Sequence, residues 1–264
     1  MDYGRYTQNL RIDLRDGVLR VALHNPPMNC NTKALHTALS QIWSDIHDDD
    51  DVRVVVFTGE GRAFSAGGDI KAMQETVDHP EQWWPTLTEA KRIVFRMLEC
   101  DKPVIARVNG HAIGFGATLA LACDIIVAVD TAKFGDPHVN AGLVAGDGGA
   151  LLWPQAIGFP RAKEALLLGE PIPAKRAEEI GLINYAVPAD ELDAKVDAIA
   201  RKLANGAQRS IRWTKQVLNL QLRMIAHPVM EHGMANETLS QFSEDHAEAV
   251  AAFAEKREPK FTGR

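Results

Sequence analysis

Two glycine-rich segments constrain the fold of this chain more than any other feature, because each follows a β-rich run and precedes a helical one. The first, Gly61-Arg-Ala-Phe-Ser-Ala-Gly-Gly-Asp69, follows the continuous β-branched run Val52 to Thr58. The second, Gly110-His-Ala-Ile-Gly-Phe-Gly116, follows Pro103 to Val108 and precedes an apolar helix from Ala117 to Cys123. This repeated order of strand, loop and helix predicts βαβ units and an α/β fold with a mostly parallel sheet.

The remaining patterns predict a strand near the N-terminus and a mainly helical second half. We expect a strand at Gly17 to Leu23, helices at Asn31 to Ile46 and Ile70 to Cys100 (the second broken by Pro80 and Pro85), a strand at Asp124 to Val129, and helices at Ala162 to Leu168, Ala174 to Ile180, Asp190 to Ala204, Ser210 to Ala226 and Met234 to Lys256. The chain is therefore predicted to have an α/β core over residues 1–195 and a helical region over residues 196–264.

Composition excludes several classes of protein and partner. The 264 residues are 46% hydrophobic and 24% charged, which is ordinary for a globular protein and not for a disordered chain or a fibre. A net charge of −6 without a basic run predicts no nucleic-acid partner and no anionic membrane surface. Cys30, Cys100 and Cys123 lack metal-like spacing, so we expect no metal site and a reducing compartment. With no apolar leader segment and no membrane span, the predicted location is the cytoplasm.

The two glycine segments suggest a binding site of main-chain N–H groups. A helix start offers free N–H groups and a positive dipole end, and glycine lets a ligand oxygen approach the backbone. Two such starts aimed at one point would form an oxyanion hole. The alternative is two tight turns that bind nothing. Neither segment is a phosphate-binding P-loop or a dinucleotide fingerprint.

Beyond these patterns, several motifs together resemble the crotonase (enoyl-CoA hydratase/isomerase) superfamily over nearly the whole chain. The motifs are Phe64-Ser-Ala-Gly-Gly-Asp-Ile-Lys71, Gly110 to Gly116, Ala122-Cys-Asp-Ile125, Phe134-Gly135 and Gly142-Leu-Val-Ala-Gly-Asp-Gly-Gly149. The resemblance implies a spiral of ββα turns, with residues 196–264 as a helical C-terminal trimerisation region. It also implies a homotrimer or a dimer of trimers.

The same resemblance implies an acyl-CoA thioester as substrate, with coenzyme A as part of it and no separate cofactor. By position, the N–H groups of Gly68 and Phe115 would form the oxyanion hole that stabilises a thioester enolate. The implied substrate-binding residues are Ala66, Asp69, Lys71 and Thr118, with Lys71 directed at the coenzyme A phosphates.

The chain departs from the family at the two glutamates that position water in the hydratases, where it has Thr118 and His138. His138 and Asp147 are nine residues apart, and a histidine oriented by a carboxylate is a natural general base, with an ordinary pKa of about 6.5. The alternative is that His138 and Asp147 only cap neighbouring elements.

A His and an Asp at this spacing also resemble the C–C bond hydrolases typified by oxocamphor hydrolase. That branch carries a Glu on the C-terminal helix, matched by Glu237, and a His on the first helix, matched by His36. A further His of the branch is matched only by Gly116, and the branch lacks the Ala-Gly-Gly-Asp loop that is intact here. Glu237 is therefore a third candidate catalytic residue.

Three functions remain open from the sequence. The first is an acyl-CoA enzyme of the hydratase/isomerase family, a lyase of fatty acid metabolism. The second is a C–C bond or thioester hydrolase that uses His138 and Asp147, and the third is a non-catalytic acyl-CoA binder. Trp83 and Trp84 are interpreted as covering a helix joint, in preference to lining an acyl pocket.

Overall fold

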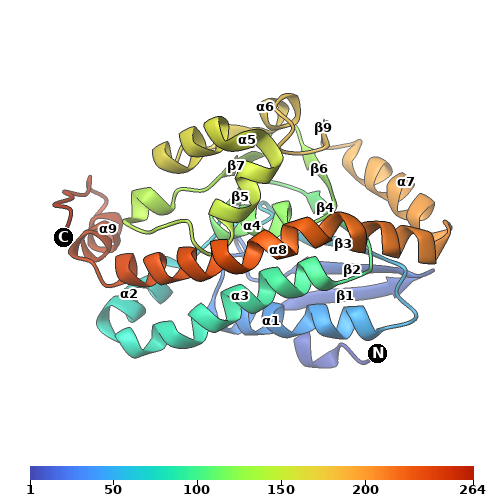
Figure 1. The fold of residues 1–264 in the computed structure, drawn as a ribbon, viewed down its shortest axis with the longest axis horizontal. Helices are drawn as coiled ribbons and strands as arrows, with labels where there is room; N and C mark the ends of the chain where they lie inside the picture. The colour runs from blue at the N-terminus through green and yellow to red at the C-terminus, as the bar shows by residue number, and fades with distance from the viewer.

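The computed structural model describes residues 1–264, and a six-stranded sheet forms its centre (Figure 1). The strand order is β1-β2-β3-β4-β6-β9, in which only β1 and β2 pair antiparallel, and a smaller sheet has the order β5-β7-β8. The strands are β1 (Leu10–Arg15), β2 (Val18–Leu23), β3 (Val54–Gly59), β4 (Val104–Val108), β5 (Ala112–Ile113), β6 (Ile125–Val129), β7 (Lys133–Gly135), β8 (Ile172–Pro173) and β9 (Tyr185–Val187).

Helices surround these sheets and make up most of the second half of the chain. They are α1 (Lys33–Asp48), α2 (Ile70–Asp78), α3 (Trp83–Glu99), α4 (Phe115–Leu121), α5 (Gly149–Leu168), α6 (Ala174–Glu179), α7 (Leu192–Ala204), α8 (Gln208–Gln241) and α9 (Glu244–Glu255), with short 3₁₀ turns η1 (Gly4–Tyr6), η2 (Pro80–Gln82) and η3 (His138–Ala141). No helix combines the length and the apolarity that crossing a bilayer requires.

The α/β fold with a mainly parallel sheet is confirmed. All six residues of β3 are buried, as the β-branched run in this segment predicts for a strand covered on both faces. The edge strand β1 was not predicted, because its mostly exposed residues include the charged Arg11, Asp13 and Arg15 and form no apolar run. Helix α3 packs between α1 and α8, and Figure 1 shows the three helices one above another, while α7 packs on β3, β4 and β6. Residue 195 lies inside α7, and the division of the chain there stays a prediction.

Two helix predictions are wrong, both because of proline. Pro85 does not break a helix, because it lies in the first turn of α3, where no intrahelical N–H bond is required. Pro228 lies inside α8, which continues through it to Gln241. The helix predicted from Met234 to Lys256 is therefore the end of α8 followed by α9. The Ser243 side chain caps α9 by accepting from the His246 N–H.

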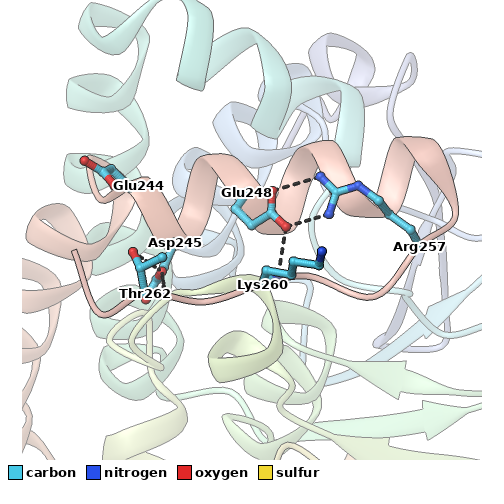
Figure 2. A pocket seen from close by; sticks show the side chains of 6 residues that line it. All are labelled: Glu244, Asp245, Glu248, Arg257, Lys260 and Thr262. Carbon is cyan, nitrogen blue, oxygen red and sulfur yellow. Dashed lines mark hydrogen bonds and ion pairs between the residues drawn. The ribbon is translucent and has the colours of Figure 1, made fainter.

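The last residues fold back along α9 (Figure 2). The Arg257 guanidinium pairs with the Glu248 carboxylate and lowers the pKa of Glu248 to about 2. The main-chain N–H groups of Thr262 and Gly263 donate to the Asp245 carboxylate at 2.6 and 2.9 Å. These contacts fix the outer face of α9, and the opposite face contributes to the cavity described next.

Candidate active site

The two glycine-rich segments pair side by side where α2 and α4 begin. The Ser65 N–H donates to the His111 carbonyl at 3.1 Å, and the Ile113 N–H donates back to the Ser65 carbonyl at 3.0 Å. Gly67 and Gly114 have φ angles of +84° and +55°, and a Cβ on Gly67 would lie 2.6 Å from the Ile113 carbonyl oxygen. Only glycine satisfies these requirements, so the local sequence brings the two helix starts together.

Two main-chain N–H groups at this junction, those of Gly68 and Phe115, have no hydrogen-bond acceptor within the protein. Phe115 is the first residue of α4, and Gly68 precedes Asp69, the N-cap of α2. The Asp69 side chain accepts from the N–H groups of Lys71 and Ala72 at 2.9 and 3.1 Å, so its main task is to cap the helix. The free N–H groups of Gly68 and Phe115 are the donors that an oxyanion hole requires.

A cavity of 510 Å³ is bordered by both of these residues. Its size lies in the range of small-molecule sites, roughly 300–1,000 Å³. The predicted site residues that line it are Ala66, Gly68, Asp69, Phe115, His138, Asp147 and Glu237. The structure therefore gathers residues from the first third, the middle and the C-terminal helices of the chain around one space.

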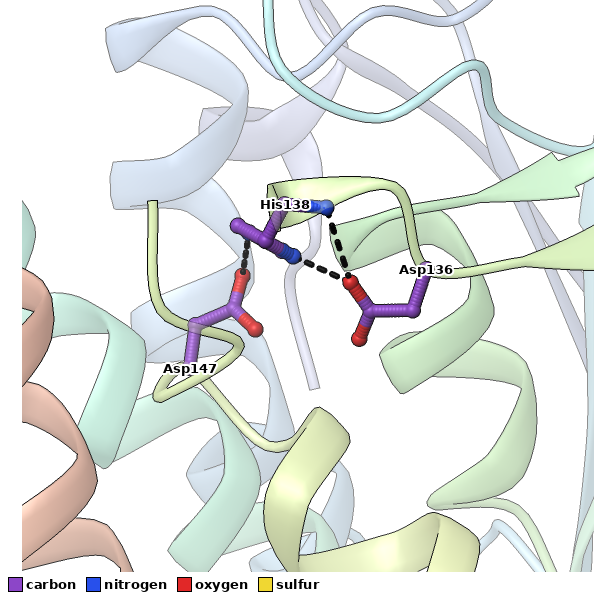
Figure 3. Close-up of side chains that lie close together, drawn as sticks. All are labelled: Asp136, His138 and Asp147. Atoms are coloured by element: carbon purple, nitrogen blue, oxygen red, sulfur yellow. Dashed lines mark hydrogen bonds and ion pairs between the residues drawn. The ribbon is translucent and has the colours of Figure 1, made fainter. Parts of the chain in front are cut away.

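His138 lies between two carboxylates (Figure 3). Its Nδ1 is hydrogen-bonded to Asp136 Oδ1, and its Nε2 lies 3.4 Å from Asp147 Oδ2. The side chain of Asp136 is fully buried, whereas Asp147 borders the cavity. The pair predicted from the sequence is thus a group of three.

These contacts set the charge of His138. Burial alone would lower the pKa of the imidazole, but the carboxylates of Asp136 and Asp147 outweigh it and raise the pKa well above its usual value. The ordinary pKa assumed from the sequence therefore does not hold. The raised pKa favours the imidazolium, the form of the ring that donates a proton.

The loop between η3 and α5, Gly146-Asp147-Gly148-Gly149, leaves room for side chains from other elements. A Cβ on Gly146 would lie 2.9 Å from Glu237 Oε2, a Cβ on Gly148 would overlap Thr118 Cγ2, and a Cβ on Gly149 would overlap Asp136 Oδ2. Asp147 is the one side chain that this loop contributes. The glycine pattern thus serves the assembly of the acidic group around His138.

Glu237 is buried on α8 beside this group. Burial raises the pKa of the Glu237 carboxyl well above its usual range, and the Asp147 carboxylate adds to the effect. The raised pKa favours the protonated carboxyl, the form that can donate a hydrogen bond.

Two predicted substrate-binding residues do not line the cavity. Thr118 is fully buried beside Gly148, and its hydroxyl has no hydrogen-bond partner. The Lys71 side chain is exposed on the first turn of α2.

The structure corrects the interpretation of the two tryptophans. Trp83 lines the cavity and donates to Thr238 Oγ1 at 2.8 Å, while Trp84 is exposed and stacks near Phe242.

A second histidine–carboxylate pair borders the same cavity. His36 Nδ1 lies 2.9 Å from Glu89 Oε2, and the imidazole packs on the Phe115 ring with centroids 5.3 Å apart. Glu89 comes from α3, so sequence spacing gives no hint of this pair. Asp136 was missed although it lies two residues before His138. The turn at Pro137 that brings its carboxylate to Nδ1 could not be read from residue types.

Asp136, His138 and Asp147 are also the residues whose chemistry could suit a metal ion. One possible ligand atom from each lies within 4.8 Å of the others. Both ring nitrogens of His138 already face carboxylate oxygens, so a metal ion would have to displace one of these contacts.

Comparison with known proteins gives one consistent family. A model of the enoyl-CoA hydratase/isomerase family matches residues 13–264. The chain is similar to a probable enoyl-CoA hydratase of Mycobacterium bovis, with 32% identity over 263 residues that cover 96% of each chain.

Solved structures agree with this similarity. An enoyl-CoA hydratase/isomerase from Mycobacterium paratuberculosis superposes with a TM-score of 0.89 at 36% identity, covering 92% of this chain and 97% of that one. A β-diketone hydrolase from Anabaena, bound to (S)-3-oxocyclohexyl acetic acid, superposes with a TM-score of 0.84 at 31% identity, covering 91% and 98%.

Proposed function

Because this chain belongs to the enoyl-CoA hydratase/isomerase family, we propose that it adds water reversibly across the double bond of a 2-enoyl-CoA thioester. Coenzyme A enters as part of the substrate, and no separate cofactor takes part. The observation that carries the proposal is the pair of unbonded N–H groups of Gly68 and Phe115 on one cavity. When these groups donate to the thioester carbonyl oxygen, they stabilise the negative charge that develops there as the enolate forms.

The Asp136–His138–Asp147 group then replaces the two missing glutamates. His138, held as an imidazolium, donates its proton to C2 of the enolate. Asp147, whose Oδ1 has no partner, accepts a proton from the water that attacks C3. The product is a 3-hydroxyacyl-CoA, and the proton balance between the two groups is restored through bulk water. The exposed Lys71, on the first turn of α2, is available to meet the phosphates of coenzyme A.

A second candidate, hydrolysis of a C–C bond in a β-diketone or of a thioester, is favoured by one observation. The similar Anabaena protein is a β-diketone hydrolase, and this chain has a His–Asp contact beside its cavity. In that reaction water would attack a carbonyl carbon, the C–C bond would break, and His138 would protonate the enolate that leaves.

Incubation of the protein with short, medium and aromatic 2-enoyl-CoAs, with 3-oxoacyl-CoAs and with β-diketones separates these functions. Formation of 3-hydroxyacyl-CoA supports the proposed function. Release of free coenzyme A or cleavage of the carbon chain supports a hydrolase instead. Tight binding of thioesters without turnover of any compound would leave a non-catalytic acyl-CoA binder.

The proposed assembly is a homotrimer or a dimer of trimers. Four apolar side chains on α8, Trp213, Val217, Leu220 and Met224, are between 53% and 72% exposed. Their spacing of four, three and four residues puts them on one face of the helix, which we term the α8 stripe. This face supports an assembly through the helical region.

A further inference from the structure

Helix α8 contributes polar side chains to the cavity, from a part of the chain far from the N–H groups of Gly68 and Phe115. Glu237 and Gln241 lie four residues apart, one turn along the helix, and both line the cavity. Each is only 4% exposed. Glu237 Oε2 and Gln241 Nε2 have no hydrogen-bond partner in the protein.

Polar atoms of this kind are costly to bury. A buried donor or acceptor without a partner costs roughly 1–3 kcal/mol, so native proteins keep few of them outside functional sites. Here Asp147 Oδ1, from a different element, borders the same cavity and also lacks a partner. Three unpartnered polar groups around one cavity indicate that a ligand atom completes their hydrogen bonds.

On the rest of the α8 and α3 surface in the cavity no buried polar atom lacks a partner, and the one other polar side chain, Thr86, is half-buried. Trp83, Ala90 and Met234 form a small apolar cluster, which suits an acyl chain. The only polar atom of the Trp83 side chain is already used, because its indole N–H donates to Thr238 at 2.8 Å. Glu237 and Gln241 therefore stand out as the part of this surface that is made for an oxygen atom.

We propose that Glu237 and Gln241 form an oxygen subsite that binds the oxygen carried by C3 of the acyl group. This inference rests on the proposed function. In the forward reaction the subsite holds the attacking water, and in the reverse reaction it holds the hydroxyl of the 3-hydroxyacyl-CoA. A protonated carboxyl and a primary amide each offer one donor and one acceptor side, so together they can serve a water or a hydroxyl. Asp147 lies beside them to take the proton.

The proposed subsite lies at a different place in the fold from the two glutamates of the hydratases. Thr118, at the first of those positions, does not reach the cavity. The oxygen-binding function has moved from the helix after the second glycine loop to α8. It follows that the preferred ligands are acyl-CoAs with an oxygen on C3, compared with saturated acyl-CoAs of the same length.

The test is a binding comparison of two matched thioesters, 3-hydroxyoctanoyl-CoA and octanoyl-CoA, by titration calorimetry. The wild-type protein should bind the hydroxylated thioester more tightly. Gln241→Leu should weaken binding of 3-hydroxyoctanoyl-CoA about 3- to 10-fold, the usual range for one neutral hydrogen bond, and leave octanoyl-CoA unchanged. A matched control is Asn236→Leu, which removes the same amide from the outer side of α8, where it contacts His232.

A second pair of variants tests the hydrogen-bonding group of Glu237. Glu237→Gln keeps a group of the same shape that can donate and accept a hydrogen bond, so it should preserve the preference for 3-hydroxyoctanoyl-CoA, whereas Glu237→Leu should lose that preference. If Glu237→Gln loses the preference as completely as Glu237→Leu, the subsite as proposed is overturned.

The outcomes separate this inference from the proposed function. Equal binding of the two thioesters by the wild type, or equal weakening of both by Gln241→Leu, overturns the oxygen subsite and leaves thioester chemistry intact. Failure of the wild type to bind either thioester overturns the proposed function, and the subsite with it. Circular dichroism of Gln241→Leu provides the folding check, and no loss of stability is expected, because the substitution removes an unpartnered buried amide.

Discussion

At the scale of single residues, the charge of His138 decides which chemistry the site can perform. The imidazolium is stabilised by Asp136 on one nitrogen and Asp147 on the other. Since the folded-state pKa is raised, this arrangement also contributes to stability. The contribution is fully present below the unfolded histidine pKa of about 6.5 and is lost as pH rises through the folded pKa.

The first prediction follows from that charge. If the His138 imidazolium is the proton donor, kcat/KM for hydration should stay level near neutral pH and fall as pH rises through its raised pKa. Asp136→Asn removes one carboxylate, so the alkaline fall should begin at a lower pH. A pH–rate profile of both proteins checks this. A wild-type rate that falls below pH 6.5 and is unchanged above it would show that His138 acts as a base.

A second prediction concerns the unit formed by His138 and Asp147. His138→Ala should lower kcat by about 10²–10⁴, the usual contribution of proton transfer by a positioned side chain, and Asp147→Asn should cost a similar factor. The double variant should be little slower than the slower single variant, because the two side chains act together. KM should change little, since the N–H groups of Gly68 and Phe115 hold the thioester. Additive losses in steady-state kinetics would mean that the two side chains act independently.

A third prediction concerns Thr118, whose replacement should not lower turnover or stability. Its buried hydroxyl makes no hydrogen bond, so Thr118→Val should leave the melting temperature unchanged or raise it, and turnover should be kept. Thr118→Ala should likewise be mild in turnover. Thermal unfolding and initial rates measure both effects. An inactive Thr118→Val protein would be contrary evidence, because it would place water activation at this hydroxyl.

At the scale of elements, the loop from Gly146 to Gly149 is the part whose shape the site depends on most. Its three glycines give space to Glu237, Thr118 and Asp136, which come from two helices and the segment after β7. The loop therefore accommodates side chains from other elements. Its glycines are required because these side chains lie where a Cβ would be.

The fourth prediction tests whether the loop needs these glycines. A Cβ at residue 149 would overlap Asp136 Oδ2, so Gly149→Ala should destabilise the protein by about 1–3 kcal/mol and disturb the carboxylate on His138. The control is Gly4→Ala, where the nearest atoms belong to the flexible Asp2 side chain. Chemical denaturation compares the two. Equal stability of Gly149→Ala and wild type would show that Asp136 moves aside freely.

The sequence predicts those elements well that are determined locally. The β-branched run from Val52 and the two glycine segments have their expected structure, because strand propensity and glycine φ angles are local properties. The course of α8 through Pro228 was not predictable, because packing against α3 and α5 outweighs the local cost of proline.

The residues of the candidate site likewise divide into those that the local sequence predicts and those that depend on packing between distant segments. Gly68 and Phe115 follow from motifs, and their N–H groups border the cavity. The contact of Asp136 with His138 and the pairing of His36 with Glu89 depend on how distant or turning segments pack, which no spacing in the chain encodes. The catalytic roles of His138, Asp147 and Glu237 stay predictions.

At the scale of the whole molecule, the α8 stripe leaves a row of large apolar side chains in contact with water. Burying such a row stabilises an assembly by about 25 cal/mol for each Å² of apolar surface removed from water. A monomer has no other element that covers these residues. The stripe is thus the surface through which copies of this chain are expected to meet.

The fifth prediction is that the protein is a trimer or a dimer of trimers at micromolar concentration, measured by light scattering. Val217→Glu combined with Met224→Glu should shift the mass toward the monomer, because charges would be buried without partners. Glu231→Gln, at an exposed position of the same helix, is the control. A monomeric wild-type mass would exclude the proposed assembly.

The continuity of α8 has a consequence for which changes in chain length the protein can tolerate. Met224 and Gln241 lie on one unbroken helix, about 26 Å apart along its axis. A single residue inserted between them would rotate Glu237 and Gln241 by about 100° relative to the stripe, away from the cavity, even if every side chain were retained. The spacing between the two surfaces is therefore as restricted as their composition. This stretch can accept substitutions on its outer face, but it cannot accept an insertion or deletion that changes the helical phase.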